Sequence, residues 1–239
     1  DQEFLIRSRV AKGLSNLRIT DRKDLDENSK SWRLKLLSEM EATEDNSNVK
    51  VAIWASQVAL SNERDFKQDK ISQLISVART GKGKPAIEAT MEVAQLAPRE
   101  DKTRQLFKEL LEKSDEQQLL EVGIRHLSSL RDNWVQTQLD KFLEDKRERV
   151  RLAVVQSLHL SCPQNRWSIL ESVLKSDRSK LVTQAALQAP TFMPGPDATA
   201  FVERMLNTQE VSEEESKVLT RVANELKNST RLNPCIANQ

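Results

Sequence analysis

The chain has 239 residues, of which 38% are hydrophobic and 31% charged, and its 37 basic and 36 acidic side chains give a formal net charge of +1. This balance excludes an overall electrostatic field that would attract nucleic acid or an anionic membrane. With 5 Gly, 7 Pro and no Tyr, the composition is unlike the turn-rich, aromatic-rich make-up of β-sandwiches and barrels, so an all-α class is expected.

The hydropathy pattern bears on location. No apolar run approaches the roughly 20 residues that a membrane-spanning helix needs, and no basic-then-apolar signal segment opens the sequence, so a soluble protein is predicted. The first residue is Asp1 and not Met, which indicates either a processed product or a truncated chain.

The first predicted helix covers most of residues 1–20 and is expected to cap the N-terminus. Its apolar residues recur every three or four positions, at Ile6, Val10, Leu14 and Leu17. This spacing predicts one buried face of an amphipathic helix. A polar segment from Thr20 predicts a loop, and the next helix is expected to begin near Ser31.

A repeated pattern then begins, and its first component is an apolar triad at positions i, i+3 and i+4. The triads are Leu74/Val77/Ala78, Phe107/Leu110/Leu111, Leu139/Phe142/Leu143, Leu170/Val173/Leu174 and Val202/Met205/Leu206. Subtraction gives 31 to 33 residues between consecutive first members. Each triad predicts one helix, and we call these the A helices.

A second helix, which we call the B helix, is predicted after each short polar turn, with apolar or small residues at i, i+3, i+4, i+7 and i+8. The B helices begin their patterns at Val51, Ala86, Leu119, Val150, Val182 and Leu219. Small residues such as Ala89, Gly123 and Ala153 recur inside these patterns, which favours close contact with neighbouring helices. Helical pairs of this length cannot bury their faces alone, so the pattern predicts a stacked array.

The fourth B helix carries a family resemblance. Asp145, the segment 150–153 (Val-Arg-Leu-Ala) and Leu158 resemble the signature of HEAT repeats, and the resemblance extends over about residues 31–228. It implies an all-α, right-handed superhelix of about six helical pairs behind an N-terminal capping helix. The A helices would lie outside and the B helices would line a concave docking face. The expected divisions are 1–20 for the cap, 21–228 for the HEAT-like solenoid and 229–239 for a C-terminal tail.

Polar residues between the core positions of the B helices would then form a ladder along the concave face. This predicted ladder comprises Gln57, Glu88, Glu92, Gln95, Glu121, Arg125, Ser128, Gln156, His159, Gln188 and Glu225. Because it mixes glutamine with both signs of charge, it suits a protein or peptide segment better than a phosphate backbone. The alternative is an ordinary solvated helix surface with no ligand.

No catalytic, metal or cofactor site is predicted, since His126 falls on a core position and His159 has no third partner at a ligand spacing. The expected function is therefore a non-catalytic protein-binding scaffold. Two alternatives remain. One is a HEAT-like enzyme that acts on nucleic acid or on a chromophore-carrying protein, as DNA alkyl-purine glycosylases and phycobilin lyases do. The other is a purely structural spacer in an assembly.

The two cysteines, Cys162 and Cys235, lack the spacing of redox motifs and zinc sites. Two stacked repeats span roughly 20 Å. The tail from Asn228 reaches about 23 Å when extended, so a disulfide is feasible. Free thiols are the alternative. A bridge would predict an extracytoplasmic compartment, periplasmic or secreted, whereas free thiols would predict the cytoplasm.

Overall fold

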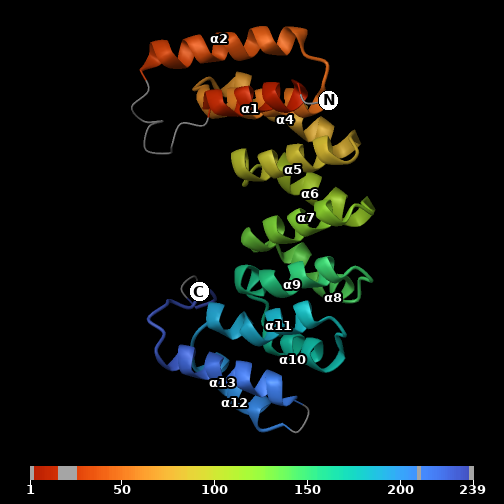
Figure 1. Ribbon diagram of the computed structural model, residues 1–239, viewed down its shortest axis with the longest axis vertical. Coiled ribbons are helices and arrows are strands. Elements are labelled where there is room, and N and C mark those ends of the chain that lie inside the picture. Colours follow the sequence, from red (N-terminus) through yellow and green to blue (C-terminus); the bar gives the residue numbers. More distant parts are fainter. Residues whose placement is uncertain (1–2, 16–25, 209–210, 237–239) are drawn as a thin grey trace. The chain divides into compact units, whose positions relative to one another are not determined.

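The computed structural model describes residues 3–15, 26–208 and 211–236, and within them it contains thirteen α-helices, one 3-10 helix and no strand (Figure 1). The helices are α1 (Glu3–Ser15), α2 (Glu27–Thr43), α3 (Ser47–Leu60), α4 (Arg64–Thr80), α5 (Lys84–Leu96), α6 (Asp101–Lys113), α7 (Gln117–Ser129), α8 (Asn133–Leu143), α9 (Glu148–Ser161), α10 (Arg166–Ser176), α11 (Lys180–Gln188), the 3-10 helix η1 (Ala189–Phe192), α12 (Pro196–Leu206) and α13 (Glu213–Lys227). The chain divides into two compact units, Asp1–Leu119 and Leu120–Gln239.

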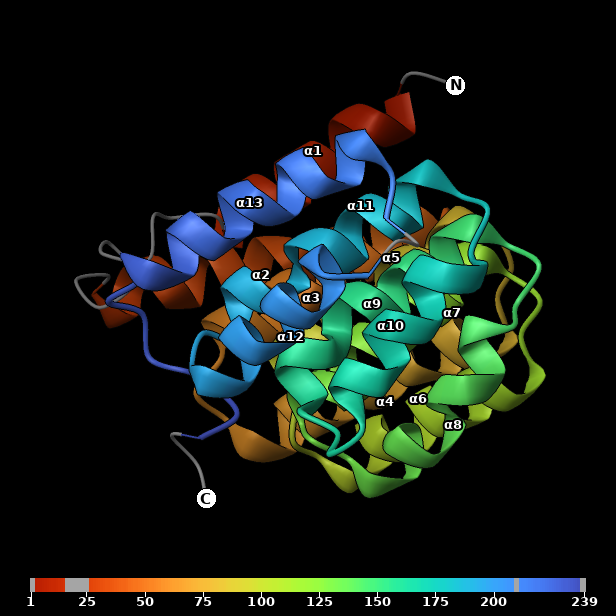
Figure 2. The ribbon, with the colours of Figure 1, turned by 90° about the horizontal axis from the view of Figure 1, so that it is seen from below.

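The described helices after α1 alternate along the chain as A and B helices, as the repeat pattern predicts. The A helices are α2, α4, α6, α8, α10 and α12, and the B helices are α3, α5, α7, α9, α11 and α13. Within each unit the partners of a pair contact one another, and consecutive B helices also touch, namely α3 with α5, α9 with α11 and α11 with α13. Figure 2 shows α11 and α13 on one side of the C-terminal unit and α10 and α12 on the other.

The core of the N-terminal unit is built around α3. This helix contacts α1, α2, α4 and α5, and nine of its 14 residues are buried. Ala52 and Ile53 are fully buried in a cluster with Ala11 of α1 and Leu37 of α2. Because α3 is covered on several sides, even its polar positions lie in the interior.

The buried face of α1 differs from the one predicted. Ala11 and Ser15 are buried, whereas Ile6 and Val10 are 60% and 47% exposed; Leu17 lies outside the described residues. Small side chains allow α1 to approach α3 closely, and the Ser56 hydroxyl donates to the Ala11 carbonyl over 2.9 Å. The hydrophobic spacing therefore predicted the helix and the contact of Leu14, which packs against the core cluster, but not the burial of Ala11 and Ser15.

The residues that carry the HEAT resemblance join two consecutive repeats in the C-terminal unit. The Arg151 guanidinium donates to both carboxylate oxygens of Asp177, at 2.6 and 3.0 Å, and to the Asp145 carbonyl oxygen at 2.8 Å. Burial raises the pKa of Asp177, but the hydrogen bonds from Arg151 and from the Ser179 amide outweigh it and lower the pKa. Arg151 thus links the turn between α8 and α9 to the turn between α10 and α11.

We expect Arg151→Ala to lower the free energy of unfolding by about 2 kcal/mol, because it leaves the 7%-exposed Asp177 side chain without its main donor. Since the folded-state pKa of Asp177 is depressed, this contribution is present above the ordinary aspartate pKa and is lost as the pH falls through the folded value. Denaturant titrations at neutral and acidic pH measure both effects. Arg149→Ala is the control, since the Arg149 side chain is 62% exposed. Equal losses in the two variants would contradict the assignment.

Candidate binding site

Two residues of the predicted ladder lie in the interior, which corrects the sequence-based expectation. Gln57 is fully buried, and its side-chain amide donates to Glu41 of α2 over 3.0 Å. Ser128 of α7 is also fully buried. Gln57 is hidden because α2 covers this side of α3, a contact that the spacing within α3 does not reveal. Neither residue is available to an external partner.

Three ladder residues of the N-terminal unit, Glu88, Glu92 and Gln95, lie on α5 beside α1. Lys12 of α1 lies 3.8 Å from the Glu88 carboxylate. Burial raises the pKa of Glu92; the nearby Lys12 opposes the shift and Glu88 adds to it. A cavity of about 130 Å³ is lined by Lys12, Glu92 and Gln95 among others. The acidic residues of this part of the ladder thus already interact with Lys12 of the chain's own N-terminal helix.

In the C-terminal unit, neighbouring B helices connect through their ladder residues. Arg125 of α7 donates to the Gln156 side-chain oxygen of α9 over 3.0 Å, and both side chains are exposed. Glu121 lies 3.8 Å from Arg149. These contacts place Arg125 beside Gln156 at the rim of the larger feature described next.

A groove lies between α9 and the end of α11. It has a volume of about 290 Å³, and we call it the α9–η1 groove; its lining residues are Val155, Gln156, His159, Ala185, Gln188, Ala189, Phe192 and Met193. Three predicted ladder residues, Gln156, His159 and Gln188, meet here. The floor is apolar and the rim carries amide groups, which is the usual chemistry of a binding pocket.

The local sequence explains the shape of this groove. Pro190 has no backbone N–H and interrupts the α-helix, so α11 ends at Gln188 and the chain continues as the 3-10 turn η1. This turn brings the Phe192 ring next to His159, with ring centroids 5.3 Å apart and an angle of 29° between the planes. Sequence reasoning missed Phe192 and Met193. The proline at the end of a B helix, followed closely by an aromatic residue, was the available signal.

The centre of the groove is uncharged at neutral pH. Burial lowers the pKa of His159, and a hydrogen bond with the backbone of Gln156 opposes this only in part, so the imidazole stays neutral. Phe192, which lines this groove, is 48% exposed. A neutral, partly aromatic cavity of this size favours an apolar side chain as its occupant.

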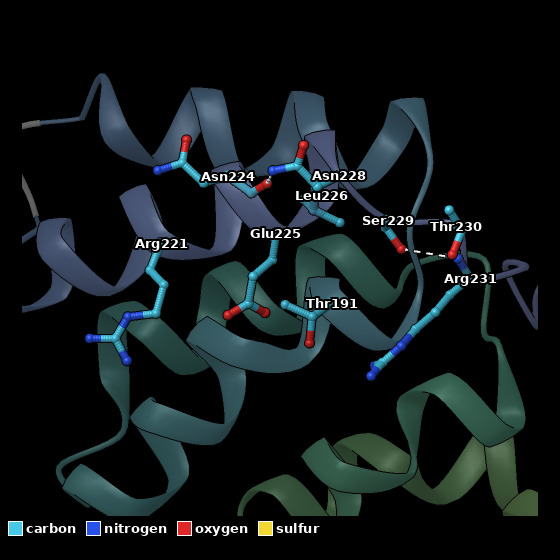
Figure 3. A pocket seen from close by; sticks show the side chains of 9 residues that line it. All are labelled: Thr191, Arg221, Asn224, Glu225, Leu226, Asn228, Ser229, Thr230 and Arg231. Atoms are coloured by element: carbon cyan, nitrogen blue, oxygen red, sulfur yellow. Dashed lines mark hydrogen bonds between the residues drawn. The ribbon is translucent and has the colours of Figure 1, made fainter.

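A second, polar pocket lies on the other side of η1, against α13. It has a volume of about 500 Å³, and we call it the α13 pocket; its lining residues are Thr191, Arg221, Asn224, Glu225, Leu226, Asn228, Ser229, Thr230 and Arg231. Figure 3 shows Arg221 and Arg231 on the two sides of Glu225 and Thr191. Glu225, a predicted ladder residue, is therefore part of this pocket. Because Thr191 and Phe192 are adjacent, the two pockets share η1.

The C-terminal tail is attached next to both pockets by a disulfide. Cys162, the residue that caps α9, is bonded to Cys235, with the two Cα atoms 5.3 Å apart. The Asn233 side-chain amide also donates to the Met193 carbonyl over 3.4 Å, and Arg131 donates to the Pro234 carbonyl. The bridge that the sequence left open against free thiols is thus present in the structure. It holds the tail beside Met193 of the α9–η1 groove.

Within residues 3–15, 26–208 and 211–236, no three His, Cys, Asp or Glu side chains cluster as metal ligands would. None of the helices described there has the length and apolar character needed to cross a membrane.

Comparisons with known proteins bear on the fold. No protein-family model matches the sequence, and no curated protein matches it significantly. The X-ray structure of the Escherichia coli protein YibA is similar to this structure with a TM-score of 0.54 and 14% sequence identity, over 94% of this chain and 82% of that one. YibA is a HEAT-like repeat protein. At this identity the match shows the fold alone, and the all-α HEAT-like fold predicted from the repeat pattern is confirmed.

Proposed function

We propose that this chain is a non-catalytic scaffold that binds a segment of another protein on the B-helix face of its C-terminal unit. The observation that carries the proposal is the α9–η1 groove, where three predicted ladder residues surround an apolar floor. Phe192 is half exposed, and Gln156 and Gln188 are open to solvent on the rim. An apolar centre within a polar rim is the general composition of protein-binding surfaces.

The disulfide supports a proposal about location. Both cysteines of the chain take part in it, so no thiol is left for a metal or a nucleophilic role. Disulfides persist in oxidising compartments and are rare in the cytosol. We propose that the protein acts in an extracytoplasmic compartment and meets its partner there.

The proposal predicts where a partner touches the chain. A photo-crosslinking amino acid at Gln188 is expected to form a covalent adduct with a partner in the native source, detected by mass spectrometry. The same amino acid at Ser172, an exposed position on the A helix α10, is expected to form none. Adding Phe192→Ser to the Gln188 variant removes the groove's aromatic wall and should abolish the adduct. Crosslinks at Ser172 alone, or adducts that persist without Phe192, would contradict the proposal.

A further inference from the structure

Three arginines lie around the two pockets without a carboxylate partner among the described residues. Arg125 contacts Gln156 of the α9–η1 groove, and Arg221 and Arg231 line the neighbouring α13 pocket. None of these three side chains forms an ion pair within the described residues. Other arginines of the same unit do have carboxylate partners within 4 Å, among them Arg147, Arg149, Arg151, Arg166 and Arg204. Arg221 and Arg231 therefore present free positive charge at the α13 pocket, and Arg125 does so beside Gln156 of the α9–η1 groove.

These cations lie on both sides of the apolar groove. On the α7 side, Arg125 donates a hydrogen bond to Gln156, which lines the groove. Arg221 and Arg231 line the α13 pocket on the other side, with Thr191 of η1 between the two pockets. Among the described residues, Glu225 is the single acidic one that lines either pocket. The surface thus has an uncharged apolar centre with positive charge on both flanks.

We infer that the partner segment is acidic and carries one bulky apolar side chain with carboxylates on either side of it. This inference rests on the proposed function. The apolar side chain occupies the α9–η1 groove against Phe192, and the flanking carboxylates pair with the unpaired arginines. Arginine forms directed, two-pronged hydrogen bonds with carboxylates, so such pairs contribute orientation as well as attraction.

A nucleic acid fits this surface less well, although it too is anionic. The groove floor consists of Val155, Ala185, Ala189 and Met193 side chains, which offer no hydrogen bonds to base edges. Glu225 lies between Arg221 and Arg231 and would repel a continuous row of phosphates. A peptide can place a neutral residue or a backbone amide opposite Glu225, whereas a phosphate backbone has no such freedom.

A library of random short peptides displayed on phage, selected on the oxidised full chain, tests the inference. We expect the enriched sequences to combine Phe, Trp, Leu or Met with Asp or Glu on both sides. A synthetic enriched peptide, followed by fluorescence anisotropy, should bind about tenfold more weakly to Phe192→Ala and to the double variant Arg221→Gln/Arg231→Gln. Binding should also weaken as salt is added.

Arg178→Gln is the matched control for charge. Arg178 is exposed in the turn between α10 and α11, outside the residues that line either pocket, so its loss should leave peptide binding unchanged. Enriched peptides that need Phe192 but show no acidic preference would overturn this inference and leave the proposed function standing. Failure to enrich any peptide, or binding indifferent to Phe192, would overturn both. Tighter, Phe192-dependent binding of a labelled single-stranded oligonucleotide would also overturn the inference.

Discussion

Replacing Cys235 with serine is expected to lower the free energy of unfolding by about 4 kcal/mol. The disulfide joins residues separated by 73 positions, and in the chain-entropy account a cross-link over such a loop restricts the unfolded chain by roughly that amount. Guanidinium titration of the variant and of the oxidised wild type measures the difference. Reduction should destabilise the wild type similarly and leave the variant unchanged.

The same substitution should loosen the tail. Cys235 is only 5% exposed, and Ser229, Thr230 and Arg231 line the α13 pocket. Without the bridge the tail keeps noncovalent contacts, such as the hydrogen bonds from Asn233 to Met193 and from Arg131 to Pro234. We expect faster tryptic cleavage after Arg231 and faster hydrogen exchange in residues 229–236. Equal stability and unchanged exchange would show that the tail is held without the disulfide.

Replacing Glu41 with alanine is expected to cost about 3 kcal/mol of stability, for a different reason. Its carboxylate accepts hydrogen bonds from three donors on other helices: Trp54 at 2.8 Å, Gln57 at 3.0 Å, and Lys70 at 2.7 and 2.9 Å. The Lys70 side chain is 9% exposed, so removal of Glu41 leaves a nearly buried cation without its main counter-charge. This network joins α2, α3 and α4, and its loss should weaken the whole N-terminal unit.

Two further variants distinguish the effect of an unpaired buried charge from the effect of shortening a glutamate side chain. Glu39→Ala should cost less than about 0.5 kcal/mol, because the Glu39 side chain is 63% exposed and 4.0 Å from Lys35. The double variant Glu41→Leu/Lys70→Met removes both charges and should recover much of the loss. Denaturant titrations measure all three variants. If the double variant is less stable than Glu41→Ala, the unpaired Lys70 charge does not explain the loss.

The network also makes the N-terminal unit sensitive to acid. Burial raises the pKa of Glu41, but the hydrogen bonds from Lys70, Gln57 and Trp54 outweigh it, so the folded-state pKa is depressed. The contribution is therefore present above the ordinary glutamate pKa and is lost as the pH falls through the lower folded value. The stability difference between wild type and Glu41→Ala should shrink over that acidic range.

The sequence by itself determined the alternation of A and B helices and about how many there are, because helix period and polar turns are local properties that recur in each repeat. The B helices whose patterns begin at Val150 and Val182 are α9 and α11 in the structure. The ladder positions that belong to the groove, Gln156, His159 and Gln188, followed from the same period. The local pattern was sufficient to predict a residue's position wherever its surroundings are the same in each helical pair.

Only the tertiary structure decided the features that depend on non-repeating neighbours. Ala11 and Ser15 of α1 are buried because α3 is near, and Gln57 is buried because α2, with Glu41, lies opposite it. Phe192 reaches His159 because Pro190 ends α11 early, and Cys235 reaches Cys162 because the tail turns back to α9. Each of these contacts joins segments far apart in the chain, and the spacing within one helix carries no information about them.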